Sequence, residues 1–221
     1  MDIKGPKFDV RCAFEVNTKR EFNLLCYPIF YAYLNSLSGL LHNENIDSIT
    51  IIFNDSGEDN FFGSKKIIGV NKSMDFSQFW NLSDESKRLF LLNSFKNIFT
   101  YLSNEYNLEL SQDELEKGIF DTIENNYHWK NDLTIIKESP RKKRKIKISF
   151  EYDFIAQLAV VFLEQISPEQ TRIKLLCCKA IWYYLDKVVG KLTWLNDDEL
   201  ILVPQEKFPT LNYSSLYIKN V

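Results

Sequence analysis

Six of the eight residues from Pro140 to Lys147 are basic, in a chain of 221 residues whose formal net charge is -3. They are Arg141, Lys142, Lys143, Arg144, Lys145 and Lys147. Clustered cations neutralise phosphates or attract an acidic protein surface, because summed charge steers association over a Debye length of about 8 Å at physiological salt. This basic segment therefore indicates a binding function before a catalytic one.

Three interpretations of the basic segment stay open. A lysine-rich hairpin discourages edge-to-edge strand pairing and keeps a protein soluble. Contact with nucleic acid or with an acidic partner is the second, although the acidic remainder of the chain disfavours a dedicated nucleic-acid protein. A nuclear-import signal is the third, and a hairpin would hide the extended form that such a signal requires.

Aromatic and acidic side chains are further candidates for partner contact. Trp and Tyr commonly dominate the binding energy of an interface, which makes Trp129 and Trp194 candidate anchors. Asp197 and Asp198 fit the chemistry of a hairpin turn, and they are also candidate partner-binding carboxylates.

The sequence holds no recognisable catalytic centre. Its only histidines, His42 and His128, lie at predicted helix ends and are predicted to be capping or surface residues. No nucleophile elbow, zinc-protease pair, P-loop or dinucleotide glycine pattern occurs. We therefore predict no catalytic residue, no metal site and no cofactor.

Two acidic patterns resemble known sites without matching them. Asp55, Glu58 and Asp59 share one predicted loop, but their spacing is not that of a calcium-binding loop. The triplet Glu85-Ser86-Lys87 resembles a nuclease motif, yet it falls on a helix start, where capping explains it.

Composition predicts a folded protein of the cytoplasm. Apolar residues make up 45% of the chain, enough for a large core, and no run approaches the roughly 18 apolar residues of a membrane span. The first residues lack the apolar core of a signal peptide. Cys12, Cys26, Cys177 and Cys178 have neither disulfide-framework nor zinc-ligand spacing, so we predict reduced, buried cysteines.

In the first half, alternating apolar residues predict a strand over 8–16, and further strands over 46–53 and 66–71 that form a hairpin or meander. Helical periodicity predicts a helix from about Tyr27 to Leu41, with Pro28 in its first turn. Two more amphipathic helices are predicted to form an antiparallel pair. They span 83–106 and 111–127, and the second begins with a capping box at Ser111.

The second half is predicted to mix hairpins and helices. Strands over 132–138 and 144–152 place the basic segment at a hairpin tip. Next, the pattern predicts a nearly buried helix over 153–164 and a helix from Ser167 to about Val189 that ends at Gly190. A late hairpin, 192–195 with 199–203, and an edge strand over 213–218 complete the prediction.

Together these patterns predict an α+β fold, with antiparallel hairpins packed against amphipathic helices. We expect one domain over 1–221, or alternatively two joined halves, 1–128 and 129–221.

The function that the sequence favours is a non-enzymatic protein-binding protein of the bacterial cytoplasm. Its most specific form is an immunity protein that occludes a toxin or effector. An unrecognised carboxylate or metal-dependent hydrolase and a nucleic-acid accessory protein are the alternatives. Membrane binding is not expected, and the oligomeric state is left open.

Overall fold

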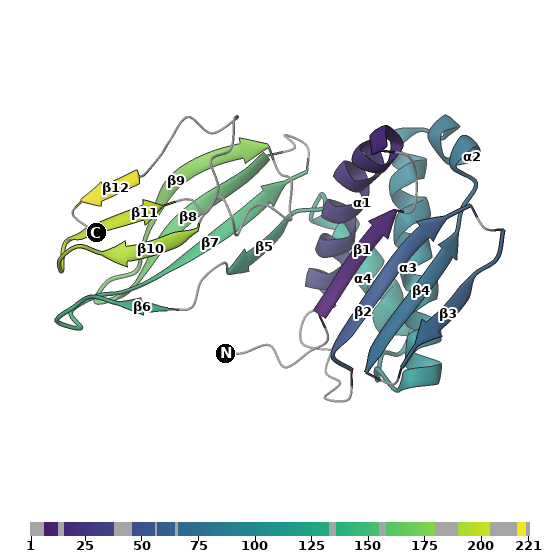
Figure 1. Ribbon diagram of the computed structural model, residues 1–221, viewed down its shortest axis with the longest axis horizontal. Coiled ribbons are helices and arrows are strands. Elements are labelled where there is room, and N and C mark those ends of the chain that lie inside the picture. Colours follow the sequence, from purple (N-terminus) through teal and green to yellow (C-terminus); the bar gives the residue numbers. More distant parts are fainter. Residues whose placement is uncertain are drawn as a thin grey trace. The chain divides into compact units, whose positions relative to one another are not determined.

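The computed structural model describes most of the chain. The described residues are 7–12, 16–37, 46–55, 57–64, 66–132, 136–154, 158–179, 190–203 and 216–219. They separate into two compact units, Met1–Tyr127 and His128–Val221. Helices and antiparallel strands are both abundant, which confirms the predicted α+β class (Figure 1). The described helices include none with the length and hydropathy to cross a bilayer.

The first unit contains a four-stranded sheet. Its strands are β1 (Lys7–Cys12), β2 (Ser48–Asn54), β3 (Asn60–Gly63) and β4 (Ile67–Ser73), in the order β1-β2-β4-β3. β1, β2 and β4 run parallel, and only β3 is antiparallel to its neighbour β4.

The strands predicted over 46–53 and 66–71 are confirmed as β2 and β4, but the hairpin predicted between them is wrong. The chain first runs back along the sheet edge as β3, so that β4 returns in the direction of β2. Val16, predicted as the end of the first strand, already belongs to a helix.

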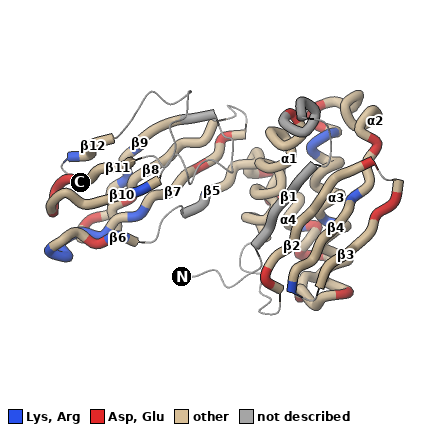
Figure 2. Tube along the Cα trace, in the orientation of Figure 1, with Lys and Arg blue, Asp and Glu red and all other residues tan. Residues whose placement is uncertain are grey.

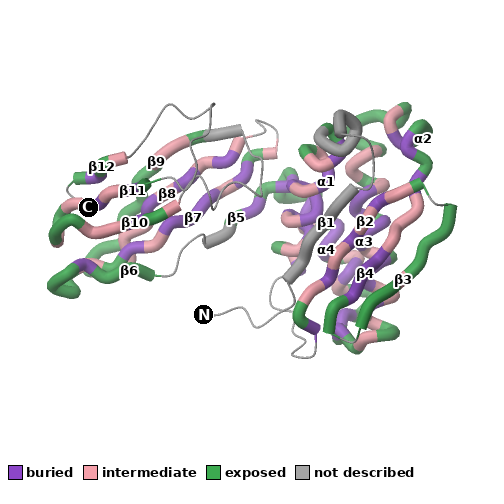
Figure 3. The backbone as a smooth tube through the Cα atoms, in the orientation of Figure 1, coloured by how far each residue is buried: buried purple, intermediate pink, exposed green. Residues whose placement is uncertain are grey.

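Within the described residues, four helices accompany this sheet: α1 (Val16–Ser36), α2 (Phe76–Asn81), α3 (Asp84–Tyr106) and α4 (Gln112–Glu124). Figure 1 shows α1, α3 and α4 on one face of the sheet. Along β2, every second residue is buried, namely Ile49, Ile51 and Phe53, as expected for a strand with one covered face (Figure 3).

Helix α1 begins about three turns earlier than predicted, and Pro28 lies in its interior. An interior proline costs roughly 3 kcal/mol of helix stability. Burial of Phe22 and Cys26 before the proline, and of Phe30 after it, offsets that cost, because each of these side chains is fully buried. Local propensity is therefore overridden by packing. Residues 38–45, where the predicted helix was to end, lie outside the described part of the chain, as does His42.

Helices α3 and α4 confirm the predicted pair, although α4 ends at Glu124 and does not reach Tyr127. Ser83 caps α3, and Ser111 with Glu114 forms the predicted capping box of α4. The two helices are antiparallel, because Lys96 bonds to Glu116 while Thr100, one turn later, bonds to the earlier residue Gln112.

The second unit is built from antiparallel strands in two sheets. The larger sheet has the order β5-β7-β8-β9, with β6 also paired to β7, and the smaller has the order β10-β11-β12. The strands are β5 (Trp129–Asp132), β6 (Lys137–Glu138), β7 (Lys145–Asp153), β8 (Leu158–Ser167), β9 (Thr171–Lys179), β10 (Lys191–Trp194), β11 (Glu199–Val203) and β12 (Leu216–Lys219).

Both helices predicted for this unit are wrong within the described residues. The segment predicted as a buried helix contains most of β8, and the start of the next predicted helix is β9. A strand explains the alternation of buried Ala159, Val161 and Leu163 with the less buried residues between them. Residues 180–189 lie outside the described part. The late hairpin and the strand near the C-terminus are confirmed.

Candidate binding surface

The predicted hairpin tip exists as the turn between β6 and β7, here called the basic turn (residues 139–144). Its backbone is closed by hydrogen bonds from Ser139 N–H to the Arg144 carbonyl (2.9 Å) and from Lys142 N–H to the Ser139 carbonyl (2.8 Å). The Ser139 hydroxyl accepts bonds from the N–H groups of Lys143 (3.1 Å) and Arg144 (3.2 Å). Ser139 is only 2% exposed. The turn therefore has a fixed shape, organised by a buried serine.

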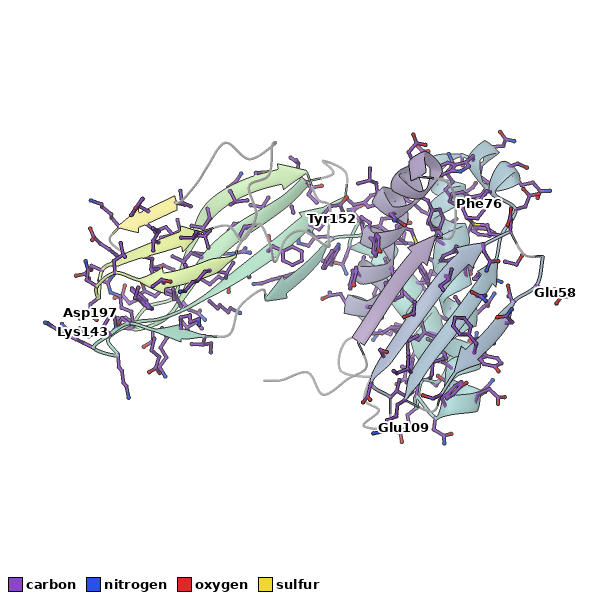
Figure 4. All side chains as sticks on the ribbon, in the orientation of Figure 1. Glu58, Phe76, Glu109, Lys143, Tyr152 and Asp197 are labelled. Atoms are coloured by element: carbon purple, nitrogen blue, oxygen red, sulfur yellow. The ribbon has the colours of Figure 1, made fainter. Side chains whose placement is uncertain are left out.

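A second turn, between β10 and β11, contacts the basic turn. We call it the acidic turn (residues 195–198). Asp197 accepts a bond from the Arg141 N–H (2.9 Å) and lies 3.6 Å from its guanidinium, and Asp198 pairs with Arg144 at 2.9 Å. Figure 4 shows Lys143 and Asp197 at the same end of the unit. Two groups predicted separately as partner-binding candidates are thus each other's neighbours.

The electrostatics of Asp197 reflect this contact. The hydrogen bond from the Arg141 backbone is the main cause that lowers the pKa of the Asp197 carboxyl, with further lowering by the Ser139 hydroxyl and the charges of Arg141 and Lys143. Within the same hairpin Lys145 pairs with Glu138 at 2.9 Å and lowers the pKa of that carboxyl.

Lys142 and Lys143 differ from the other cations of the basic turn. Both are exposed, and neither forms an ion pair with the described residues. Lys142 has φ of 56°, in the left-handed region that non-glycine residues rarely occupy. These two side chains are the cations of the turn that a partner can reach without breaking an ion pair.

Lys147 belongs to a different cluster, on the charged face of the larger sheet. We define this face by the charged side chains that strand register places on one side, namely Lys130, Lys147, Glu151, Asp153, Glu164, Arg172 and Lys174. Glu164 is its centre: its carboxylate lies 2.9 Å from Lys130, 3.3 Å from Lys147 and 3.3 Å from Arg172. It also accepts a bond from the hydroxyl of buried Ser149 (2.6 Å).

Burial of Glu164 favours its neutral form and is the largest single influence on it. Hydrogen bonds from Ser149, Lys130 and Lys147 together outweigh that influence and lower the pKa of the Glu164 carboxyl to about 2. The charge on Glu164 is therefore part of the folded structure at every physiological pH.

Arg172 links three neighbours on this face. Its guanidinium pairs with Glu151 at 2.7 Å and with Glu164, and it lies over the Phe162 ring, 3.5 Å from the ring centroid. The Phe162 ring is consequently covered by a cation.

The two tryptophan candidates have different environments. Trp129, a candidate anchor from the sequence, is only 3% exposed and packs edge to face on Phe150, with ring centroids 5.0 Å apart, so its ring is part of the core of the unit. Trp194 is partly exposed at the end of β10, and the following residue, Leu195, is 51% exposed in the acidic turn.

The remaining candidates from the sequence have structural partners. Asp59 pairs with Lys72 and accepts a bond from the Ser73 N–H, and Glu85 lies in the first turn of α3. His128 is exposed. Cys26 is buried as predicted, whereas Cys177 is exposed, contrary to the prediction. No group of three or more His, Cys, Asp and Glu side chains within the described ranges is arranged to hold a metal ion.

A shallow groove is also present in the first unit, with a volume of about 380 Å³ between the end of β4 and α3. Its polar side chains are largely occupied: Asp75 caps α2, Ser94 donates to the Phe90 carbonyl and Lys72 pairs with Asp59. It offers no arrangement of acid, base and nucleophile.

Formal charge divides unevenly between the units. The first unit holds 12 of the 27 basic and 19 of the 30 acidic residues, a net charge of -7, whereas the second holds 15 and 11, a net charge of +4. Figure 2 shows basic residues concentrated at the basic turn. The acidic remainder that counted against a polyanion partner thus belongs mainly to the other unit.

Sequence reasoning missed Ser139, Glu164 and Arg172. A serine directly before a Pro-Arg-Lys turn is a local signal that could have identified Ser139. Glu164 and Arg172 gain their role from partners on neighbouring strands, which no local pattern contains. Comparisons of the chain with protein-family models, curated proteins and solved structures give no match.

Proposed function

We propose that this is a non-enzymatic binding protein of the cytoplasm whose basic turn docks on an acidic surface of a partner protein. The observation that supports this proposal best is the fixed shape of the turn. Ser139 and Asp197 hold its backbone, so Lys142 and Lys143 extend from a rigid support and little conformational entropy is lost when a partner binds.

Side chains beside the turn suit a protein interface. Leu195 adds an exposed apolar surface next to the ion pairs, and Trp194 lies immediately before it. Interfaces commonly combine a small apolar centre with a charged rim that sets orientation and association rate.

The specific form of the proposal is an immunity protein that neutralises a bacterial toxin or effector by covering its active surface. Occlusion needs a rigid, complementary surface and no catalytic group, which fits a chain in which we find no catalytic constellation among the described residues. The partner in this form carries an acidic patch beside its active site.

The test begins with affinity purification from the native organism after nuclease treatment, to obtain a stoichiometric partner. Its binding is then measured for the wild type, for the double variant Lys142→Glu with Lys143→Glu, and for Lys191→Glu with Lys219→Glu. The control pair makes the same charge change on the smaller sheet. We expect the turn variant to lose binding and protection from the partner's activity, and the control to keep both.

A second variant separates binding from stability. Lys142→Gly removes a side chain from a left-handed backbone position, so folding stability should stay equal or rise while partner affinity falls. Failure to recover any partner, or equal affinity of the wild type and the turn variant, would refute the proposal.

A further inference from the structure

Strand β3 forms an open edge of the sheet in the first unit. It stands last in the strand order and pairs with β4 on one side, and nothing among the described residues pairs with its other side (Figure 1). Edge strands are commonly protected from further pairing by a lysine, a proline or a bulge. The sequence of β3, Asn-Phe-Phe-Gly, contains neither residue, and its register with β4 is continuous. The strand therefore presents an unprotected edge.

The two aromatic side chains of β3 lie on opposite faces of the sheet. Phe61 stacks on Tyr101 of α3, with ring centroids 3.4 Å apart, so Phe62 points to the face away from that helix. On that face the Phe62 ring covers Gly69 of β4, where any larger residue would collide with it, and the ring is still 48% exposed. An apolar ring is thus held in the middle of the edge with about half of its surface in solvent.

The backbone of β3 also has hydrogen-bonding groups at the edge. In the turn that joins β3 to β4, the Ser64 N–H donates to the Ile67 carbonyl (2.9 Å). Hydrogen-bonded and non-hydrogen-bonded residue pairs alternate along antiparallel strands. The N–H and C=O groups of Phe62 consequently face β4, and those of Phe61 point away from it, where a further strand can bond to them.

Charges of opposite sign flank the two ends of β3. Glu58 precedes the strand and Lys66 follows it, and both are exposed. Figure 4 shows Glu58 extending outward from the loop before β3. The Lys66 carbonyl accepts bonds from the N–H groups of Asp47 and Ser48, which fix the position of this residue. Four residues of extended chain, about 13 Å, lie between the flanks, so the edge is acidic at one end and basic at the other.

We propose that β3 pairs antiparallel with β3 of a second copy of this chain, so that the two sheets join into one. Antiparallel pairing places the acidic flank of each copy beside the basic flank of the other, and the two-fold symmetry makes this contact twice. With Phe62 on the symmetry axis, the two Phe62 rings form a cross-strand pair and Phe61 lies opposite Gly63 of the second copy. This self-complementary pattern favours a second copy over a strand of another protein.

The expected association is weak. Each copy contributes one four-residue strand, so the interface is smaller than that of stable complexes, and we expect a dissociation constant on the order of 100 µM. Because the flanks are exposed, the association should weaken at high salt. The inference concerns the first unit alone and does not depend on the partner contact proposed for the basic turn.

Sedimentation equilibrium of the full-length protein measures this association over concentrations from about 5 to about 500 µM. Glu58→Lys and Lys66→Glu should each raise the dissociation constant at least about tenfold, because like charges then meet at both flanks. An equimolar mixture of these two variants should associate with about the wild-type affinity, since two basic flanks of one meet two acidic flanks of the other.

The matched controls are Glu124→Lys and Lys117→Glu, which make the same charge changes at exposed positions of α4. Alone and mixed, they should associate as the wild type does. Phe62→Lys tests the centre of the contact, because it places two like charges opposite each other at the symmetry axis. It should abolish association while far-UV circular dichroism shows that the fold is kept.

Three results would overturn the inference. A wild type that stays monomeric at about 500 µM would leave the edge to a strand of another protein. A dimer that neither flank variant weakens would place the self-contact on a different surface. Flank variants that are both monomeric, and whose mixture is monomeric as well, would show that the two charges do not meet across a two-fold contact.

Discussion

Replacing Glu164 by glutamine should destabilise the second unit in a pH-dependent way. An unperturbed glutamate has a pKa of roughly 4.3, and the pKa of Glu164 is lowered to about 2. At about 1.4 kcal/mol for each unit, the difference corresponds to at most about 3 kcal/mol of stability at neutral pH. Because Lys130 and Arg172 are partly exposed, we expect about 1–2 kcal/mol in practice.

The sign follows from the lowered pKa. The unfolded chain binds a proton at Glu164 more readily than the folded one, so the stabilisation is fully present above about pH 5 and is lost as the pH falls towards 2. At pH 3 about half of it should remain. The difference in unfolding free energy between the wild type and Glu164→Gln should therefore be constant from pH 7 to pH 6 and should shrink below pH 4.

Urea denaturation followed by tryptophan fluorescence measures this difference. Carrying the Trp80→Phe change in every protein confines the signal to the second unit, which contains the other three tryptophans. Glu151→Gln is the matched control, because Glu151 pairs on the same face with Arg172 alone among the described residues. A loss for Glu164→Gln that is the same at pH 7 and pH 3, or no larger than the loss for Glu151→Gln, would refute the reasoning.

Three further predictions concern two glycines with crowded or left-handed backbone positions and the serine that bonds to the backbone of the basic turn. Gly118→Ala should lower folding stability by about 1–2 kcal/mol in thermal denaturation, despite the better helix propensity of alanine. The reason is that the new Cβ would lie 2.9 Å from Leu37 Cδ2 and 3.0 Å from Tyr33 Cε2. The control Lys117→Ala, at the preceding residue, should be nearly neutral. Gly63→Ala should lower folding stability by at least about 2 kcal/mol, because Gly63 has φ of 113° and the new Cβ would lie 2.2 Å from the Ile67 carbonyl oxygen. Gly57→Ala should cost only about 1 kcal/mol, because Gly57 has φ of 82° but open space around it. Equal losses of stability in urea denaturation would contradict this account. Ser139→Ala should cost about 1–2 kcal/mol and increase amide hydrogen exchange at Lys143 and Arg144; unchanged exchange at those amides would show that the serine does not organise the turn.

Features that depend on local chemistry could be predicted from the sequence. The starts of α3 and α4 were predicted correctly, because Ser83 and Ser111 act through backbone groups within three residues. The hairpin that carries the basic turn and the late hairpin were also predicted, since alternation and turn residues lie within a short segment.

Features that depend on distant partners could not be predicted. In β8 the spacing of polar residues fits a helix as well as a strand, and the choice is made by pairing with β7 and β9. The motif Ser167-Pro168 suits a helix start, but it lies at the turn that joins those two strands. Helix α1 shows the same limit, because burial of its apolar side chains outweighs the local cost of Pro28.

The candidate site was predicted as a list of residues, and its organisation came from pairing across strands. Six basic residues of the segment were identified, yet the acidic turn, Glu164 and Glu138 divide them into paired and available cations. A local pattern of charges contains Glu138 but neither the acidic turn nor Glu164, and Asp197 lies 56 residues from Arg141.

This division changes what the net charge of the segment means for binding. An ion pair at the surface contributes roughly 0–1 kcal/mol to stability. Little stability is therefore lost when an anion of a partner takes the place of the carboxylate that pairs with the cation in the free protein. The displaced carboxylate, however, remains nearby and repels the anion of the partner. For the proposed partner contact we therefore expect Arg144 and Lys147 to contribute less to affinity than their charge suggests, and Lys142 and Lys143 to contribute their full charge. Charge-neutralising substitutions at these two sets of residues should accordingly give unequal losses of affinity, although every one of them changes the net charge of the protein by the same amount.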